Sequence, residues 1–210
     1  MKVIFGTTNK RKIEDLQNII NELNLDIQVI NMDDIGWDRG EIDEKGSTIE
    51  ANSLIKAREI LSFCNNHGIN YPIITDDAGL FVDALNGKPG IYTARYADDE
   101  LAINPELPKH QCVIKLLRNL KDKDNRNAKY KCCVTSMLPN GEYYQEIGES
   151  EGIIAKNIIG KLKKPYFYSI FILNGTNVAF AELKGKELDN TYRYKALRES
   201  LKHLKMKNIT

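Results

Sequence analysis

The sequence lacks the features that mark several classes of protein. Its 30 lysine and arginine residues almost balance its 29 aspartate and glutamate residues, which leaves a net charge of +1. Proteins that hold nucleic acid through its phosphates need an excess of positive charge, and this chain has none. No apolar run approaches the roughly 20 residues that a membrane-spanning helix requires. We therefore expect neither a nucleic acid nor a membrane as a partner.

Cysteine and histidine are also scarce. The four cysteines are Cys64, Cys112, Cys132 and Cys133. They form no CxxC pair, and the three histidines do not cluster with them in the sequence. A zinc site is therefore not expected, and the cysteines are expected to be reduced structural thiols. Met1 leads into a short strand-like run rather than a signal peptide, so the expected location is cytoplasmic.

A strand, a polar turn and a helix open the chain. Residues 3–5 are apolar, residues 6–9 interrupt them, and apolar residues then recur at helical spacing. Thr8 or Asn9 is a suitable N-cap. The first turn carries three cations, Lys10, Arg11 and Lys12. Cations oppose the helix dipole there, whereas the free N–H groups of a helix start attract anions. The segment is thus either a phosphate site or a solvated basic turn, and both interpretations stay open.

A second helix is predicted after residue 47. Ser47 as N-cap, with Glu50 three residues later, fits a capping box. Asn52 and Lys56 then lie one turn apart on the polar side, and Glu44 precedes the helix. Such a polar set is usually a solvated helix face. It becomes a candidate site only if that face looks towards other functional groups.

Two adjacent carboxylates follow the apolar run at residues 71–74. We interpret this run as a buried strand that ends at Asp76 and Asp77. Successive strand side chains point to opposite faces, so the two carboxylates cannot both point into a core. One could hold a divalent cation while the other orients or deprotonates a water. The alternative is a plain turn, because Asp-Asp before glycine is also turn chemistry.

The rest of the chain mixes both kinds of element. We predict a helix that starts at residues 104–106, an aromatic strand at 166–173 and a last helix from about residue 189. Residues 139–141 are a hairpin signal between two β-prone runs, 128–138 and 142–154. Strands alternate with helices before this hairpin, so the fold class is mixed α/β. We expect a single domain over residues 1–210, with a second lobe at roughly residues 128–180.

Four stretches match the motifs of one family in the same order. Residues 7–12 are similar to its T-x-N-x-x-K turn, and residues 44–48 with Asn52 and Lys56 to its E-x-G-x-T…N-A-x-x-K-A segment. Residues 76–85 are similar to its D-D-S-G-L-x-V-x-A-L block, and residues 87–96 to its G-x-P-G-x-Y-S-x-R-Y run. The C-terminal third matches more weakly, at residues 169–171, 181–183 and 193–197. The chain thus resembles the inosine triphosphate pyrophosphatases, the Ham-type family, over nearly its whole length.

The resemblance implies a fold and an activity. The implied fold is a long curved mixed β-sheet with flanking helices, in two lobes separated by a substrate cleft, and the implied assembly is a homodimer. The implied reaction is Mg²⁺-dependent hydrolysis of a nucleoside triphosphate substrate to the monophosphate and pyrophosphate. The implied substrates are non-standard purine nucleotides such as ITP, dITP and XTP, which are removed before they enter nucleic acid.

The resemblance also assigns roles to residues. Glu44 and Asp77 would hold Mg²⁺, and Asp76 or Asp77 would orient the attacking water, with Asp77 favoured. A triphosphate carries about four negative charges, so cations are needed as well, and Lys12 and Lys56 would supply them. The catalytic candidates are Asp77, Asp76, Lys12 and Lys56. The substrate-binding candidates are Thr7, Thr8, Asn9, Lys12, Ala78, Tyr168, Lys186, Tyr192 and Arg193.

The chain departs from the family pattern at the expected base pocket. An aspartate of the family falls at about Tyr168, its S-H-R segment is Thr191-Tyr192-Arg193 here, and a serine is Ala78. Lys184 is the alternative to Lys186 as the lysine that contacts the base. Loss of hydrogen-bonding groups relaxes or redirects base selection. Two further hypotheses therefore stand: the same reaction on another base, or a nucleotide-binding protein without turnover. Tyr168 and Tyr192 are alternatively ordinary core aromatics.

Overall fold

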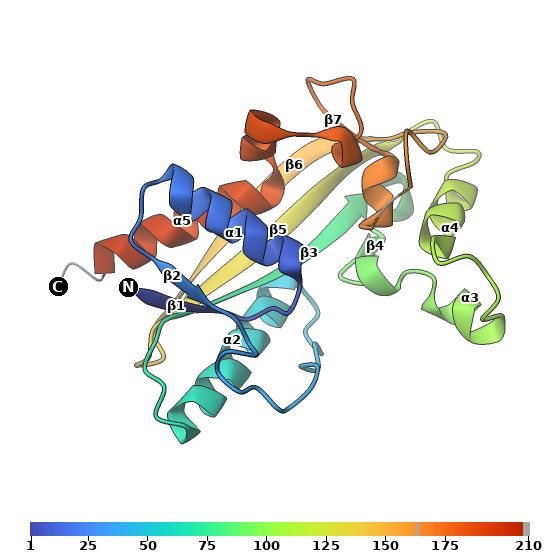
Figure 1. The fold of residues 1–210 in the computed structure, drawn as a ribbon. Helices are drawn as coiled ribbons and strands as arrows, with labels where there is room; N and C mark the ends of the chain where they lie inside the picture. Colours follow the sequence, from blue (N-terminus) through green and yellow to red (C-terminus); the bar gives the residue numbers. More distant parts are fainter. Residues whose placement is uncertain (163, 208–210) are drawn as a thin grey trace. The chain divides into compact units, whose positions relative to one another are not determined.

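A mixed β-sheet flanked by helices forms the framework of the protein (Figure 1). The computed structural model describes residues 1–162 and 164–207. The strands are β1 (Lys2–Phe5), β2 (Gln28–Ile30), β3 (Ile73–Val82), β4 (Pro89–Gly90), β5 (Asn127–Met137), β6 (Tyr143–Ile154) and β7 (Phe171–Leu173). The α-helices are α1 (Lys10–Glu22), α2 (Ile49–Asn66), α3 (Asp98–Ile103), α4 (Gln111–Asn119) and α5 (Tyr192–Lys207). The seven strands are ordered β2-β1-β3-β5-β6-β7, with β4 paired to β3. The predicted mixed α/β class is confirmed.

The chain divides into two compact units. Unit 1 contains Met1–Asp77, Cys132–Gly148 and the C-terminal residues from Tyr192. Unit 2 contains Ala78–Lys131 and Glu149–Thr191. Strands β3, β5 and β6 each contribute residues to both units.

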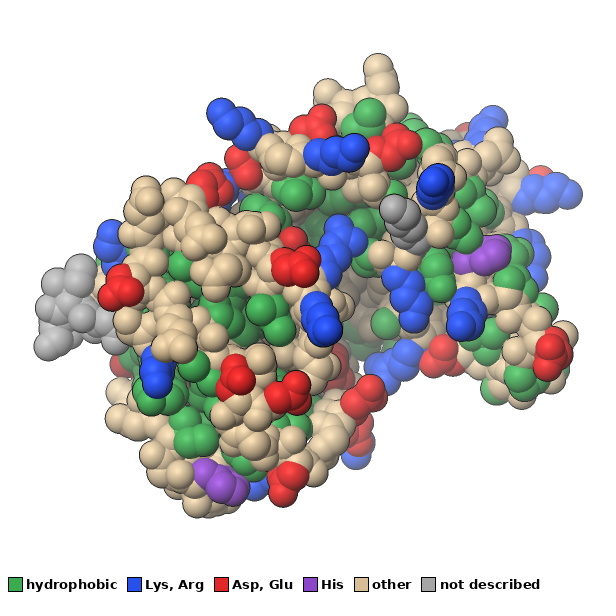
Figure 2. All heavy atoms as spheres, in the orientation of Figure 1, with side chains coloured by type: hydrophobic (Ala, Val, Ile, Leu, Met, Phe, Trp, Pro, Cys, Tyr) green, Lys and Arg blue, Asp and Glu red, His purple; other side chains and the backbone are tan. Residues whose placement is uncertain are grey.

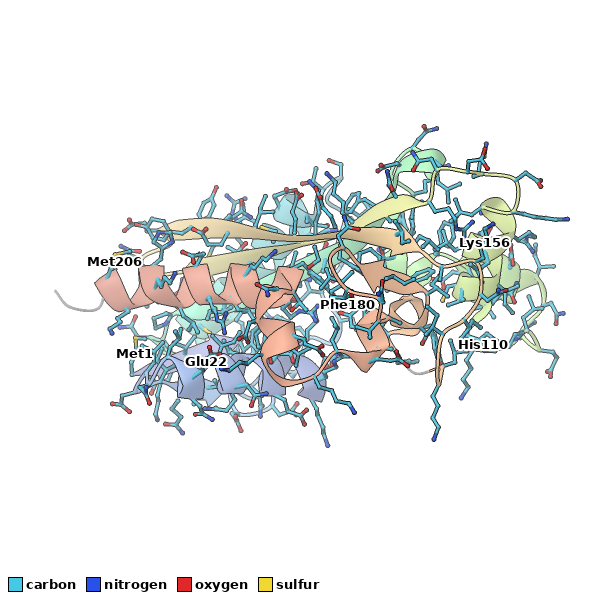
Figure 3. All side chains as sticks on the ribbon, turned by 90° about the horizontal axis from the view of Figure 1, so that it is seen from above. Met1, Glu22, His110, Lys156, Phe180 and Met206 are labelled. Atoms are coloured by element: carbon cyan, nitrogen blue, oxygen red, sulfur yellow. The ribbon has the colours of Figure 1, made fainter. Side chains whose placement is uncertain are left out.

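Unit 1 has helices on both faces of its strands. Helices α1 and α5 lie side by side, as Figure 3 shows around Glu22 and Met206, and α2 lies on the opposite face (Figure 1). Neighbouring residues of β5 show that successive side chains point to opposite faces of the sheet. Thr135 Oγ1 is 2.8 Å from the hydroxyl of Ser53 on α2, whereas Ser136 Oγ is 2.5 Å from the hydroxyl of Ser200 on α5. Two covered faces explain why β1, with Val3, Ile4 and Phe5 fully buried, is an unbroken apolar run.

Unit 2 has an aromatic core. The ring of Tyr130 on β5 lies 5.3 Å from that of Tyr168 and 5.0 Å from that of Phe171, measured between centroids. Phe180 closes the cluster at 5.1 Å from Tyr168. The prediction of a continuous strand at residues 166–173 is wrong for the first half of this range. Residues Tyr166–Ser169 form a 3-10 turn, in which Tyr168 N donates to Pro165 O, and only Phe171–Leu173 pair with β6.

The first helix, the last helix and the hairpin lie close to their predicted positions. Asn9 caps α1, because its Oδ1 accepts a hydrogen bond from Arg11 N at 3.1 Å. The hairpin between β5 and β6 is confirmed, with Gly141 N donating to Leu138 O. The last helix starts at Tyr192 rather than near residue 189, because Gly185–Asn190 form a 3-10 helix before it.

Three other predictions need correction. The two aspartates do not end a strand or form a turn, because β3 continues through them to Val82. The N-cap of α2 is Thr48, whose Oγ1 accepts from Ala51 N at 3.1 Å, and not Ser47. Residues 104–106 form a turn stabilised by Asn104 Oδ1, so α4 begins only at Gln111, and α3 before the turn was not predicted.

Side chains of both charges are interspersed on the surface shown in Figure 2, as expected for a net charge of +1. Within the described part of the chain, no helix has the length and apolar character to cross a membrane. The four cysteines are free thiols, which agrees with the sequence-based expectation.

Candidate active site

Asp76 and Asp77 lie in the middle of β3 and point to opposite faces of the sheet. The side chain of Asp76 is 1% exposed and faces α1 and α5. The side chain of Asp77 is 14% exposed and faces α2. This follows from the alternation of strand side chains, and it gives the two carboxylates different surroundings.

Asp76 is the centre of a buried group of charges. Lys12 Nζ donates to its Oδ1 at 2.8 Å, and Arg193 Nε donates to its Oδ2 at 3.2 Å. Burial alone would raise the pKa of Asp76, but the positive charges of Lys12, Arg193 and Lys56 outweigh burial and hold that pKa well below its usual range. Asp76 is therefore ionised at neutral pH, and it fixes the ends of two long cationic side chains.

A second acidic residue completes this group. Asp15, one turn after Lys12 on α1, lies 3.9 Å from Arg193 Nη1. Burial raises the pKa of Asp15, although the guanidinium of Arg193 acts in the opposite direction. The Sγ of Cys132 on β5 lies 3.9 Å from Asp76 Oδ2. Neither residue was predicted from the sequence. The i, i+3 spacing from Lys12 indicates that Asp15 lies on the same face of α1. No such spacing connects Cys132 to the site, because its position beside Asp76 depends on how β5 pairs in the sheet.

Asp77 belongs to a group on the other face of the sheet. Lys56, from the second turn of α2, places its Nζ 3.3 Å from Glu44 Oε1 and 3.8 Å from Asp77 Oδ1. One ammonium group thus sits between two carboxylates that come from distant parts of the chain. The polar side of α2 faces Asp77, which is the condition under which it becomes a candidate site.

The donor set of this group fits Mg²⁺. Mg²⁺ prefers oxygen ligands and is commonly held by one or two carboxylates together with water and substrate phosphates. Glu44 and Asp77 provide two carboxylates that already converge on one positive charge, the ammonium of Lys56. Among the residues that the structure describes, no three acidic, histidine or cysteine side chains form a metal cluster. A shared site completed by phosphate oxygens is therefore a better match than a zinc-type site.

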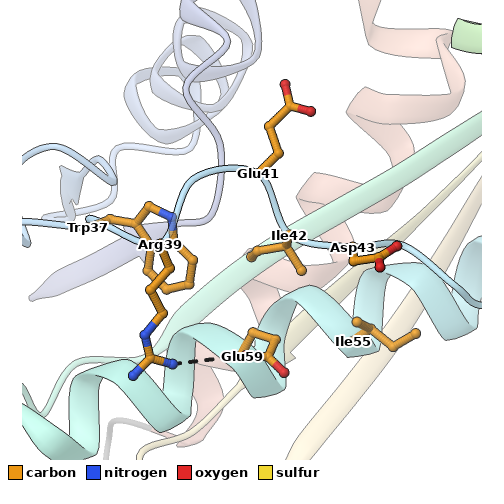
Figure 4. Close-up of a pocket in the computed structure, with 7 residues that line it drawn as sticks. All are labelled: Trp37, Arg39, Glu41, Ile42, Asp43, Ile55 and Glu59. Carbon is orange, nitrogen blue, oxygen red and sulfur yellow. Dashed lines mark ion pairs between the residues drawn. The ribbon is translucent and has the colours of Figure 1, made fainter.

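The loop that carries Glu44 is held against α2 by aromatic and ionic contacts. The ring of Trp37 lies 5.2 Å from that of Phe63, and Arg39 pairs with Glu59 at 4.0 Å. Between this loop and α2 lies a pocket of about 250 Å³ (Figure 4). Its lining consists of Trp37, Arg39, Glu41, Ile42, Asp43, Ile55 and Glu59. These contacts fix the loop immediately before Glu44.

The start of α1 offers donors beside Lys12. Thr7 Oγ1 accepts from Asn9 N at 3.2 Å, and Thr8 and Asn9 are exposed. Lys12, in the first turn, is directed to Asp76 and so does not simply extend into solvent. The negative charge of Asp76 compensates a cation that would otherwise oppose the helix dipole.

The start of α5 is fixed by a close approach to β6. A Cβ atom on Gly148 would collide with the carbonyl oxygen of Tyr192 and would lie 2.9 Å from Ala196 N. Only glycine at this strand position lets the helix come so near. The approach buries Tyr192 and directs Arg193 to Asp76. No local sequence signal distinguishes Gly148 from other glycines in strands.

Three of the predicted substrate-binding residues belong to unit 2. Ala78 is half-buried on β3, and Tyr168 is buried in the aromatic core. Lys186 is exposed in the 3-10 helix Gly185–Asn190, and so is Lys184. The groups around Asp76 and Asp77 are built from unit 1 alone, and they bring together Lys12, Lys56, Glu44 and Arg193.

Comparisons with known proteins agree with the motifs. A dITP/XTP pyrophosphatase of Flavobacterium psychrophilum is 34% identical over 199 residues, covering 94% of this chain and 96% of that protein. One from Clostridium perfringens is 31% identical over 207 residues, covering 97% of each chain. The solved Ham1 protein of Staphylococcus aureus superposes with a TM-score of 0.80 at 27% identity, covering 99% of this chain and 100% of that one. The Ham1 family model matches residues 3–203, and the chain belongs to the Ham1 family.

Proposed function

We propose that the protein hydrolyses non-standard purine nucleoside triphosphates (ITP, dITP and XTP) to the monophosphate and pyrophosphate. The observation that carries the proposal is the position of Lys56 between Glu44 and Asp77, with the separate cationic group of Lys12 and Arg193 on the other face of β3. A metal position next to fixed cations suits a triphosphate. Relatives named dITP/XTP pyrophosphatases, alike over nearly the whole chain, support the choice of substrate.

In the proposed reaction a water attacks the α-phosphorus. Asp77 orients the water and accepts its proton, the new bond joins the water oxygen to the α-phosphorus, and the bond to the bridging oxygen of the β-phosphate breaks. Pyrophosphate leaves with the electron pair of that bond. Mg²⁺, held by Glu44 and Asp77, would supply charge stabilisation of the phosphate oxygens. No covalent intermediate with the protein is needed.

The cations and the helix start would bind the phosphates. A lysine ammonium has three N–H donors, so Lys12 can keep its bond to Asp76 and still donate to a phosphate oxygen. The ammonium of Lys56, which lies between Glu44 and Asp77, would likewise donate to a phosphate oxygen. Thr7, Thr8 and Asn9 would add hydroxyl, amide and backbone donors at the start of α1. In this proposal Asp76 acts by holding Lys12 and Arg193.

The base would be recognised by the remaining candidates. These are Ala78, Tyr168, Lys186, Tyr192 and Arg193. Tyrosine can stack on a purine and donate one hydrogen bond, but it does not reproduce the acid and the histidine of the family pattern. The second candidate function is therefore the same reaction on another base. A homodimer and a cytoplasmic location complete the proposal, and light scattering coupled to gel filtration tests the dimer.

A panel of nucleotides tests the proposed function. The purified protein with Mg²⁺ is given ITP, dITP, XTP, ATP, GTP, CTP and UTP, and pyrophosphate and phosphate release are measured separately. We expect pyrophosphate and a preference for the first three nucleotides. A preference for a pyrimidine would favour the second candidate function. Binding without release from any nucleotide would leave a nucleotide-binding protein and contradict the proposal.

Substitution of Asp77 by Asn tests the mechanism. Loss of a positioned general base typically lowers the rate about 100- to 10,000-fold, and we expect a fall in kcat of this size with nucleotide binding retained. Asp43→Asn is the matched control, because Asp43 is an exposed carboxylate that pairs with Lys45 in the Glu44 loop. Its turnover should equal that of the unsubstituted protein. Unchanged turnover in Asp77→Asn would remove Asp77 from the mechanism.

A further inference from the structure

Asn52 joins the Glu44 loop to Asp77. It lies in the first turns of α2 and is 1% exposed. Its Oδ1 accepts a hydrogen bond from Gly46 N at 2.8 Å, and its Nδ2 donates to Asp77 Oδ2 at 3.1 Å. One partner is a donor and the other an acceptor, so a side-chain amide satisfies both at once. Buried hydrogen-bonding groups are costly to leave unpaired, which makes this link strong.

The link distinguishes the two oxygens of Asp77. Oδ2 is the oxygen bonded to Asn52, whereas Oδ1 is the one that faces the ammonium of Lys56. The same ammonium is closest to Oε1 of Glu44. Asn52 therefore holds the carboxylate of Asp77 in the rotation that presents Oδ1 to the point shared with Glu44.

Gly46 makes the short distance to Asn52 attainable. A Cβ atom at this position would lie 2.6 Å from Asn52 Oδ1, 2.8 Å from the Cβ of Ala51 and 3.0 Å from Asn52 N. Any side chain here would push the loop away from α2. Since Glu44 is only two residues earlier, such a shift would move its carboxylate as well.

We propose that Asn52 is a positioning residue that sets the separation of Glu44 and Asp77 and selects the oxygen of Asp77 that receives the metal. The inference rests on the proposed function, because it concerns the same metal position. Asn52 touches neither the substrate nor the metal. It acts through Asp77 on one side and through the backbone of Gly46 on the other.

Direct metal binding tests the inference separately from turnover. The affinity for Mn²⁺ without nucleotide is measured by electron paramagnetic resonance for the unsubstituted protein, Asn52→Ala and Ser53→Ala. Ser53 is the matched control: it is equally buried on α2, but it bonds to Thr75 and Thr135 rather than to Asp77. Loss of a group that orients a metal ligand typically weakens binding about 10- to 100-fold, and we expect this for Asn52→Ala alone.

A double-substitution cycle sharpens the test. Asn52→Ala removes both bonds of the link, whereas Gly46→Ala disturbs only the bond to the loop, so the double variant should bind Mn²⁺ about as weakly as Asn52→Ala alone. Urea unfolding of each variant shows that it is folded before metal is added.

Three results would overturn the inference. The first is that Asn52→Ala binds Mn²⁺ as tightly as the unsubstituted protein, or that neither protein binds it. The second is that Ser53→Ala loses as much Mn²⁺ affinity as Asn52→Ala. The third is that the losses of the two single variants add up in the double variant. Pyrophosphate release by the unsubstituted protein separately decides the proposed function.

Discussion

At the scale of single residues, Asp76 and Asp77 differ more than their adjacency suggests. Asp76 bonds to two cations through both oxygens and has almost no exposed surface. Asp77 keeps one oxygen towards Lys56 and is partly exposed. The first carboxylate is suited to hold side chains in place, and the second is suited to meet a metal and a water. The alternation of side chains along β3 produces both, because it turns one residue to each face of the sheet.

Asp76→Asn should therefore act mainly on stability. Removal of one partner of a buried ion pair costs about 3 to 5 kcal/mol, and we expect a loss of this size in the free energy of unfolding at pH 7. Urea unfolding followed by circular dichroism measures it. Asp77→Asn, the same change one position along the strand, is the control and should cost less because Asp77 is more exposed.

The free energy of unfolding that Asp76→Asn loses should also depend on pH. The pKa of Asp76 is lower in the folded protein than its ordinary value of 3.8. Its contribution is therefore fully present above pH 3.8 and is lost as the pH falls through the lower folded value. The difference in the free energy of unfolding between the unsubstituted protein and Asp76→Asn should be constant from neutral pH to about pH 5 and should shrink below pH 3.8. A difference that grows on acidification would contradict this role of Asp76.

At the scale of elements, α2 connects the Glu44 loop to β3. Thr48 caps the helix, and Asn52 and Lys56 face Asp77 on β3. Ser53 bonds to Thr75, which also lies on β3. Any shift of the first turn of α2 changes the position of these side chains together. The start of α2 is thus the part of the scaffold on which the site depends most directly.

The cap of this helix gives a simple prediction. Thr48→Ala should lower the free energy of unfolding by about 1 kcal/mol, because Thr48 Oγ1 satisfies Ala51 N. Ser47→Ala should have an effect of a few tenths of a kcal/mol at most, since Ser47 is exposed and lies outside the cap. Chemical unfolding of both variants measures the difference. The reverse order would show that the helix starts at Ser47 in solution.

Local patterns predict elements well where one pattern decides the structure. Periodicity and the N-cap identify β1 and α1, and the turn residues identify the hairpin of β5 and β6. The predicted start of α2 is displaced by one residue because Ser47 and Thr48 are both good caps, and the sequence does not distinguish them. The aromatic run after Pro165 satisfies strand propensity, but packing around Tyr130 makes it a turn.

At the scale of the whole molecule, the family motifs identify most of the candidate site from the sequence alone. Lys12, Glu44, Lys56 and Asp77 are separated by up to 65 positions, and the fold brings them into two groups on either side of β3. Their partners are harder to predict. Asp15, Cys132 and Gly148 matter through the packing of α1, α5, β5 and β6, which no short sequence pattern contains.

The position of Lys56 implies that the protein carries its own counterion. Two carboxylates in a partly buried place would repel each other in a metal-free protein, but the lysine balances them through the polypeptide itself. Without added metal, folding should then be indifferent to chelators, and the melting temperature with EDTA should match that without it. Lys56→Met, which keeps most of the length of the side chain without its charge, should make the melting temperature rise more steeply with added Mg²⁺ than that of the unsubstituted protein. A fall in the melting temperature of the unsubstituted protein when EDTA is added in the absence of added metal would show that this internal charge balance is insufficient.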